Sequence, residues 1–178
     1  MGLIYGALTE LNITDSIFAN TTSKYATAIY NNYLTHVKKS KFYNLHANLT
    51  AGAIAVKGSS EFTTTDINDC EFINVSSTKN GGALFLDIFG STDGQTNGFV
   101  KINNTVFDNC SSEFGGAMLQ LGGSAEITDS QFIKNEAKEN GGAIYTSNVL
   151  LEVANVNFTA NKANQTGGVT VKNCQDIM

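Results

Sequence analysis

Apolar and polar residues alternate in short stretches that return along the whole chain. Each copy has a β-branched aliphatic residue five positions before a Phe. The residue six positions before the Phe is polar, and the residue seven positions before it is mostly apolar or Thr. Alternation with a period of two predicts a half-buried β-strand. The phenylalanines that mark the six copies are Phe18, Phe42, Phe72, Phe107, Phe132 and Phe158.

A glycine motif runs in phase with the first pattern. The run Gly81-Gly82-Ala83-Leu84-Phe85 returns at residues 115–119 and 141–145, and weaker copies begin at residues 26, 51 and 167. The copies are 25 to 34 residues apart and always follow a Phe. Two independent features that recur together indicate internal repeats.

The pattern also predicts where each repeat bends. Apolar or small residues at five and two positions before the Phe are expected to face inward, which breaks the alternation, so a corner must lie between them. The residues at these corners are Asp15, Lys39, Asp69, Asn104, Asp129 and Asn155. Asp and Asn tolerate the left-handed conformation of a tight corner. We expect the Asn after each Phe (Asn20, Asn44, Asn74, Asn109, Asn135 and Asn161) and the glycine pair to form two further corners.

Three short strands and three corners in about 25 residues make one rung of a parallel β-helix. We therefore predict an all-β solenoid of about six rungs, forming a single β-helix domain over residues 1–178. Equivalent residues would stack about 4.8 Å apart, Phe on Phe and Asn on Asn. Both chain ends fall in the glycine-motif strand, so we expect a segment of a longer repeat protein or a unit that stacks. Longer intervals predict loop insertions near 57–65 and 87–97.

Composition narrows the class of partner. The chain has 11 Lys and no Arg, and its net charge is −5. Proteins that bind nucleic acid usually cluster Lys and Arg against the phosphates, so no nucleic-acid partner is expected. No apolar run approaches the length of a membrane-spanning segment.

The motif Phe132-Ile-Lys-Asn135 with Gly141-Gly142-Ala143-Ile144-Tyr145, together with its equivalents, resembles the repeats of polymorphic outer-membrane proteins and adhesin-like surface proteins. The resemblance covers essentially the whole chain. It implies a right-handed parallel β-helix of the pectin-lyase-like fold, located outside the cell or at its surface. The role that it implies is structural or adhesive, with no shared catalytic residues.

Pectin-lyase-like β-helices include enzymes that act on polysaccharides, so an enzyme or a glycan-binding module is the alternative. A resemblance to the lyases of this fold would imply calcium-binding carboxylates and an Arg that acts as the base. This chain has no Arg. Glycoside hydrolysis needs two carboxylates that face one cleft. The candidate pairs (Asp66 with Asp69, Asp87 with Asp93) and the histidines (His36, His46) are expected at corners and on solvated faces. We predict no catalytic residue, metal site or cofactor.

The cysteines and the glycosylation sequons have mostly structural explanations. Cys70 takes an inward position that Ser fills in other copies, so we expect a small buried side chain there. A disulfide between adjacent rungs remains an alternative for Cys110 and Cys174. Eight Asn-x-Ser/Thr sequons occur where composition predicts roughly four. Those at Asn20, Asn74 and Asn109 share the corner after Phe. The candidates for glycosylation of a secreted protein are Asn48, Asn164, Asn12 and Asn157.

The strand after the glycines predicts a contact surface. If Ala143 and Tyr145 point inward, the residue between them points outward, whereas the reversed phase would place these residues in the core. The column in question contains Ile29, Ile54, Leu84, Met118 and Ile144. An exposed apolar stripe usually marks an interface. We therefore expect self-association through this stripe or through the ends, contact with flanking repeats, or binding of glycans, in a cell-surface or filamentous assembly.

Overall fold

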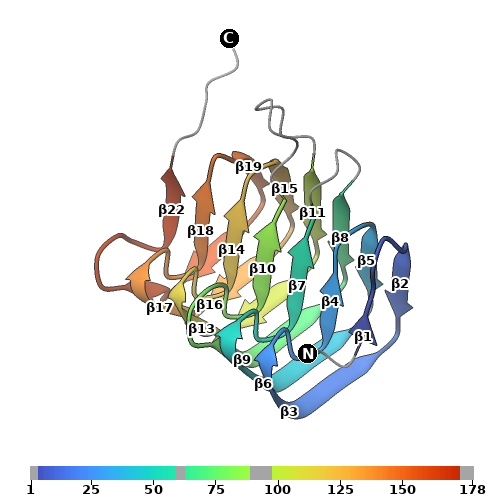
Figure 1. Ribbon diagram of the computed structural model, residues 1–178. Helices are drawn as coiled ribbons and strands as arrows, with labels where there is room; N and C mark the ends of the chain where they lie inside the picture. Colours follow the sequence, from blue (N-terminus) through green and yellow to red (C-terminus); the bar gives the residue numbers. More distant parts are fainter. Residues whose placement is uncertain (1–3, 59–62, 89–97, 173–178) are drawn as a thin grey trace.

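The computed structural model describes residues 4–58, 63–88 and 98–172, and every regular element in these ranges is a β-strand. The strands coil into a parallel β-solenoid of about six turns (Figure 1), which confirms the predicted fold class. The expected insertions near 57–65 and 87–97 fall mainly on residues 59–62 and 89–97, outside the described ranges. One domain within a longer repeat protein stays a prediction.

The rungs contribute to three parallel sheets, one for each side of the coil. The glycine sheet contains β1 (Ile4–Tyr5), β4 (Ile29–Asn31), β7 (Ile54–Lys57), β10 (Leu84–Asp87), β14 (Met118–Leu121), β18 (Ile144–Ser147) and β22 (Val169–Lys172). The alternating sheet contains β2 (Leu11–Thr14), β5 (Thr35–Lys38), β8 (Thr64–Asn68), β11 (Phe99–Asn103), β15 (Ser124–Thr128) and β19 (Leu150–Ala154). The phenylalanine sheet contains β3 (Ile17–Tyr25), β6 (Lys41–Thr50), β9 (Glu71–Ser77), β12 (Val106–Asp108), β13 (Ser111–Phe114), β16 (Gln131–Ile133), β17 (Glu136–Asn140), β20 (Asn157–Thr159) and β21 (Lys162–Ala163).

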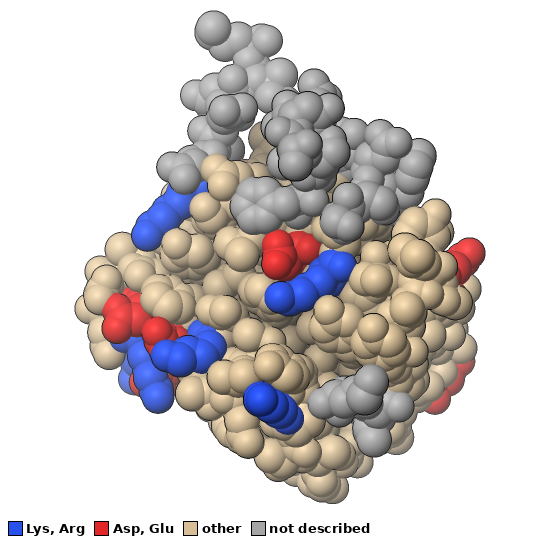
Figure 2. All heavy atoms as spheres, in the orientation of Figure 1, with Lys and Arg blue, Asp and Glu red and all other residues tan. Residues whose placement is uncertain are grey.

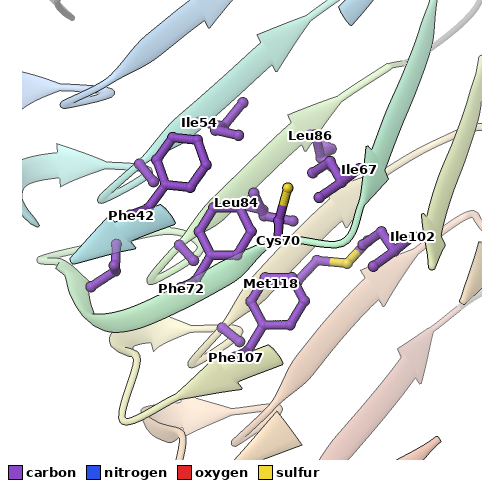
Figure 3. Close-up of a cluster of buried hydrophobic side chains, with 14 of the residues drawn as sticks. Phe42, Ile54, Ile67, Cys70, Phe72, Leu84, Leu86, Ile102, Phe107 and Met118 are labelled. Atoms are coloured by element: carbon purple, nitrogen blue, oxygen red, sulfur yellow. The ribbon is translucent and has the colours of Figure 1, made fainter. Parts of the chain in front are cut away.

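The six phenylalanines form one internal column, as predicted. Consecutive rings are stacked with their centroids 4.6 to 5.1 Å apart. Figure 3 shows three of these rings, Phe42, Phe72 and Phe107, packed beside the aliphatic side chains of the other two sheets. The four central rings are fully buried. The core is therefore built from repeated columns, and each side chain is covered by its equivalents in the rungs before and after it.

The corner before each Phe has the predicted backbone. All six corner residues, from Asp15 to Asn155, have a positive φ between 45° and 55°. A left-handed residue reverses the side-chain alternation, so the inward residues on either side of the corner both reach the core. Lys39 adopts the same conformation as the Asp and Asn residues. The shape of the rung thus determines the backbone at this corner, and the side chain only makes it easier to adopt.

The corner after Phe agrees with the prediction in four rungs and differs in two. Asn20, Asn44, Asn74 and Asn109 have φ values of 54° to 55°, and each later Asn donates from Nδ2 to the Oδ1 of the Asn one rung earlier, over 3.0, 3.3 and 2.7 Å. In the last two rungs the corner residues are Lys134 and Ala160. The prediction that Asn135 and Asn161 form this corner is therefore wrong. They lie one residue later, so their side chains turn inward.

The inward asparagines satisfy backbone groups inside the coil. Asn135 is fully buried; its Oδ1 accepts from the backbone N–H of Cys110 over 2.9 Å, and its Nδ2 donates to the carbonyl oxygen of Phe107 over 3.0 Å. Asn161 repeats this arrangement one rung later, accepting from the backbone N–H of Asn135 over 2.9 Å and donating to Phe132 over 2.8 Å. Two kinds of asparagine ladder therefore run along the coil, one at its surface and one in its core.

The glycine corner needs both its conformation and its lack of a side chain. Gly81 has a φ of +60°. Its neighbour Gly82 faces the next rung, where a Cβ would lie 1.8 Å from the carbonyl oxygen of Gly116. The two glycines therefore bring successive rungs close together at this corner, which explains why the pair recurs.

Candidate functional site

The three candidate carboxylates within the described ranges are each engaged with a neighbouring rung. Asp66 lies beside His36, with 3.1 Å between Oδ2 and Nδ1, and Asp69 accepts a hydrogen bond from Asn104 over 2.7 Å. Asp87, the last residue of β10, lies 3.8 Å from the Nζ of Lys57, the last residue of β7. Figure 2 shows that one face of the molecule is largely uncharged, with its Lys, Asp and Glu side chains gathered in a few small groups. Asp93, the fourth carboxylate considered, lies outside the described ranges.

Other charged side chains also pair from one rung to the next. The ion pairs Lys41–Glu71, Lys79–Glu113 and Lys101–Glu126 span 3.0, 2.7 and 3.6 Å. His46 shares a hydrogen bond with the hydroxyl of Ser76, in the next rung. Within the described residues, no group of three or more His, Cys, Asp or Glu side chains is placed to hold a metal ion. These groups act in register between rungs instead of converging on one point.

Cys70 and Cys110 are buried free thiols. Cys70 occupies the small inward position expected for it, between Ser40 and Thr105 in adjacent rungs, and its backbone N–H lies 3.4 Å from the Thr105 hydroxyl. Burial raises the pKa of Cys70 to about 11 and that of Cys110 to about 12. A thiol that stays protonated near neutral pH is a weak nucleophile, so these two side chains fill space. Cys174 lies outside the described residues.

The predicted contact stripe is not at the surface. Its five members, Ile29, Ile54, Leu84, Met118 and Ile144, are all fully buried in the main core (Figure 3 shows three of them). The expectation that they point outward is wrong because the strand after the glycine corner begins in the opposite phase. In the last rung Val169 pairs in register with Ile144, so the column continues to Val169.

The opposite face of the same strands is also apolar, which is why alternation could not determine the phase. Its outward column contains Tyr5, Tyr30, Ala55, Phe85, Leu119 and Tyr145. Phe85 and Leu119 are only 4% exposed, because they belong to a second apolar cluster against which neighbouring side chains pack. The Nζ of Lys57 also lies over the Phe85 ring, 5.3 Å from its centroid. Burial, followed by nearby Tyr5 and Asp87, raises the pKa of Tyr30. Little of this outer column is free to contact a partner at its centre.

The four glycosylation candidates are exposed. Asn12 lies on β2, Asn48 on β6 and Asn157 on β20, while Asn164 directly follows β21. Asn12 donates from Nδ2 to Glu10 over 3.0 Å, and Asn157 accepts from the hydroxyl of Thr159 over 3.1 Å. The sequons at Asn74 and Asn109 differ, since their side-chain amides belong to the surface asparagine ladder.

The family comparison agrees with this architecture. The model of the Chlamydia polymorphic membrane protein repeat matches residues 129–147, which run from the corner before Phe132 to the end of β18. This match and the parallel β-solenoid fit β-helix repeats of the polymorphic membrane protein and adhesin type. Comparisons with curated proteins and with solved structures gave no match.

The family is associated with the outer membrane and the cell surface, and it is generally non-enzymatic. No helix that could cross a membrane occurs in the described part of the chain.

Proposed function

We propose that this protein is a non-catalytic structural or adhesin-like element of an extracellular surface. The single observation that supports this most is the repeat match within a solenoid whose other rungs follow the same plan. A β-solenoid presents a long, regular outer surface, which suits contact with large partners better than chemistry on small ones. The proposal thus has two parts, an extracellular surface location and a role without catalysis.

The hydrogen bonds and ion pairs of the outward carboxylates support a non-catalytic role. A pair of carboxylates that performs acid–base catalysis has to face one bound substrate. Asp66, Asp69 and Asp87 are instead engaged with His36, Asn104 and Lys57 on adjacent rungs. These three carboxylates therefore stabilise contacts between adjacent rungs and do not face a shared substrate position.

The location is tested on intact cells of the source organism. A protease added outside the cells should degrade this protein, while a cytoplasmic marker protein survives until the cells are lysed. Protection of the protein until lysis would overturn the surface role.

The alternative is a carbohydrate-active enzyme or a glycan-binding β-helix. The outer aromatic side chains of the glycine sheet favour binding over catalysis, because Tyr30 and Tyr145 are partly exposed and rings of this kind pack against sugars. Purified protein incubated with polygalacturonate should release no new reducing ends or unsaturated products. Product formation that is lost in Asp66→Asn or Asp87→Asn would support the enzyme. Retention of the protein on immobilised polysaccharide, without turnover, would support the binding module.

The exposed sequons extend the proposal to N-glycosylation. Asn48 and Asn164 are exposed and lie outside both asparagine ladders, whereas the amides of Asn74 and Asn109 are each bonded to a neighbouring Asn. We therefore expect sugar on Asn48 or Asn164 before Asn20 or Asn74, with Asn12 and Asn157 as further acceptors. Peptide mapping of native protein before and after enzymatic deglycosylation measures this. An unmodified native mass would remove the idea without affecting the surface role.

A further inference from the structure

Two of the glycine corners are directly preceded by asparagine. Asn80-Gly81 and Asn140-Gly141 occupy equivalent places in two rungs, because both asparagines pair in register with Phe114 in the rung between them. A glycine has no side chain to hinder the approach of its backbone nitrogen to the preceding side chain. An Asn-Gly pair therefore forms a cyclic imide, a succinimide, more readily than other Asn pairs do.

Deamidation through this imide needs only water. The glycine N–H gives up its proton to a base in solvent, and the nitrogen then forms a bond to the Cγ of the asparagine. The bond from Cγ to the side-chain amide breaks, and this amide takes up a proton and leaves as ammonia. Water opens the imide at either carbonyl. One product is Asp, and the other is isoaspartate, in which the main chain runs through the former side chain and is one carbon longer.

Hydrogen bonds between rungs restrain both glycine nitrogens. The N–H of Gly81 donates to the carbonyl oxygen of Phe114 over 2.9 Å, and the N–H of Gly141 donates to that of Thr166 over 3.3 Å. A nitrogen whose proton is bonded to a carbonyl is harder to deprotonate. Its attack on the preceding side chain would also turn the peptide out of the ladder. The reaction therefore requires the rung to open first.

The asparagines are themselves bonded to their surroundings. Asn140 is 7% exposed, and its Oδ1 accepts a hydrogen bond from the hydroxyl of Thr166 over 2.7 Å. Asn80 is partly buried, and its carbonyl oxygen accepts from the backbone N–H of Ala51 over 3.0 Å and from the hydroxyl of Ser77 over 3.1 Å. Closed rungs thus hold both partners of the reaction at each corner.

The corner has no room for the longer product. A Cβ on Gly82 would lie 1.8 Å from the carbonyl oxygen of Gly116. One on Gly142 would lie 2.5 Å from the carbonyl oxygen of Lys162. An additional main-chain carbon directly before such a corner moves the glycines against the next rung and shifts the register of the strand that follows them. A rung that opens and forms isoaspartate therefore cannot close again in register.

From these observations we propose that Asn80 and Asn140 are latent deamidation sites, protected while the rungs are closed and converted when they open. Conversion to isoaspartate makes the opening irreversible, so these two corners limit the lifetime of the folded coil. The proposal is independent of the cell-surface role.

The protection is tested on native protein and on protein unfolded in guanidinium chloride, kept at the same temperature and mildly alkaline pH. Peptide mapping by mass spectrometry measures conversion at each asparagine, and an isoaspartate-specific methyltransferase distinguishes the two products. Asn80 and Asn140 should convert at least about tenfold more slowly in the native protein, because the rung must open first. Guanidinium below the unfolding midpoint should raise both rates, since it increases the open population. Equal rates in native and unfolded protein would overturn the proposal.

Refolding tests the irreversible step. Protein aged while unfolded should regain its β-sheet circular dichroism spectrum only in the fraction without isoaspartate at positions 80 and 140. The matched control, Asn80→Thr with Asn140→Thr, copies Thr50 and Thr166 from equivalent positions of adjacent rungs and should refold equally well before and after ageing. The remaining Asn-Gly pair, at residues 97–98, is present in both proteins, so the difference between them reports the two corners.

A second measurement applies even if unfolded protein does not refold. Native protein aged in dilute guanidinium is returned to buffer and separated by size exclusion into folded and unfolded fractions. Isoaspartate at positions 80 and 140 should occur only in the unfolded fraction. Its presence in the folded fraction, or full refolding of protein that carries it, would overturn the proposal.

Discussion

The first and last rungs repeat one sequence plan but bury it differently. The Phe18 ring and the Phe158 ring each stack on a single neighbouring ring, at centroid distances of 5.0 and 5.1 Å, yet they are 9 and 36% exposed. Ile13 and Val153 differ in the same direction, at 6 and 43%. Membership of a column therefore does not bury a side chain, because burial also requires cover on the other side of the rung. The last rung of the coil lacks that cover among the described residues.

The largest expected effect comes from truncating the phenylalanine column at different heights. Phe107→Ala should destabilise the fold by about 3–5 kcal/mol, because this ring is fully buried between two others and its loss leaves a cavity. Phe158→Ala should cost less than about 2 kcal/mol, because water already reaches the ring and no closed cavity forms. Urea unfolding of both variants measures the difference. Equal losses, or a loss below about 1 kcal/mol at Phe107, would contradict the contrast between interior and end.

The inward asparagines sharpen the same contrast with polar groups. Asn135→Ala leaves the buried N–H of Cys110 and the carbonyl of Phe107 without their partner, so we expect a loss of about 2–3 kcal/mol. Asn161→Ala removes the equivalent contacts in the partly exposed last rung, where water can replace the amide, and should cost about 1 kcal/mol. Chemical denaturation compares the two directly. A costlier change at Asn161 would mean that the last rung is as dry as the interior.

The sequence predicts the coil well where a repeated residue performs one geometric task. The corner before Phe was found in all six rungs, including Lys39, because an inward residue on each side leaves only one backbone solution. The corner after Phe was misplaced at Asn135 and Asn161. An Asn does occur next to the corner in both rungs, but its side chain points inward and belongs to the buried asparagine ladder. Aligning the residue type could not tell the two positions apart, whereas counting from the Phe separates them, because the corner is the second residue after the Phe in all six rungs.

The candidate surface was harder to predict than the fold. Alternation assigns faces only when one face is polar, and the glycine-sheet strands are apolar on both. Leu84 faces the main core and Phe85 belongs to a second apolar cluster on the outer side of the sheet. Ala83 is itself buried in the main core, but Leu84 directly after it also faces this core, so the small residue at the corner does not set the phase of the strand. The exposure of the last rung depends on which neighbours are present, and no local pattern encodes that.

The buried thiols test whether the interior rungs are dry through the pH dependence of stability. The pKa values of Cys70 and Cys110 in the folded protein, about 11 and about 12, lie above the usual value of about 8.5 for an unfolded thiol. Their contribution is therefore fully present below about pH 8.5 and is lost as the pH rises toward the folded pKa. For fully buried Cys110 the loss should approach about 1.4 kcal/mol per pH unit.

Replacements for the two cysteines can be copied from the equivalent inward positions of neighbouring rungs. Cys70→Ser copies Ser40, and Cys110→Val copies Val75. Urea midpoints at a series of pH values from neutral to about 10 should fall more steeply for the native protein than for the double variant, because Lys and Tyr titrate equally in both. Parallel curves would show that water reaches the thiols in the folded coil.

The smallest expected effects come from the outward charged column of the alternating sheet. Its interior pair, Lys101 and Glu126, attracts over 3.6 Å, whereas Glu152 in the last rung lies in register beside Glu126 and repels it. Lys101→Gln should destabilise the protein and Glu152→Gln should stabilise it, each by about 0.5 kcal/mol. Both changes should shrink in concentrated salt, since these side chains are exposed to solvent. Thermal unfolding of dilute protein at low and high salt measures them. Two shifts of the same sign, or shifts that salt leaves untouched, would show that this column owes its stability to packing of the side-chain stems and not to the order of its charges.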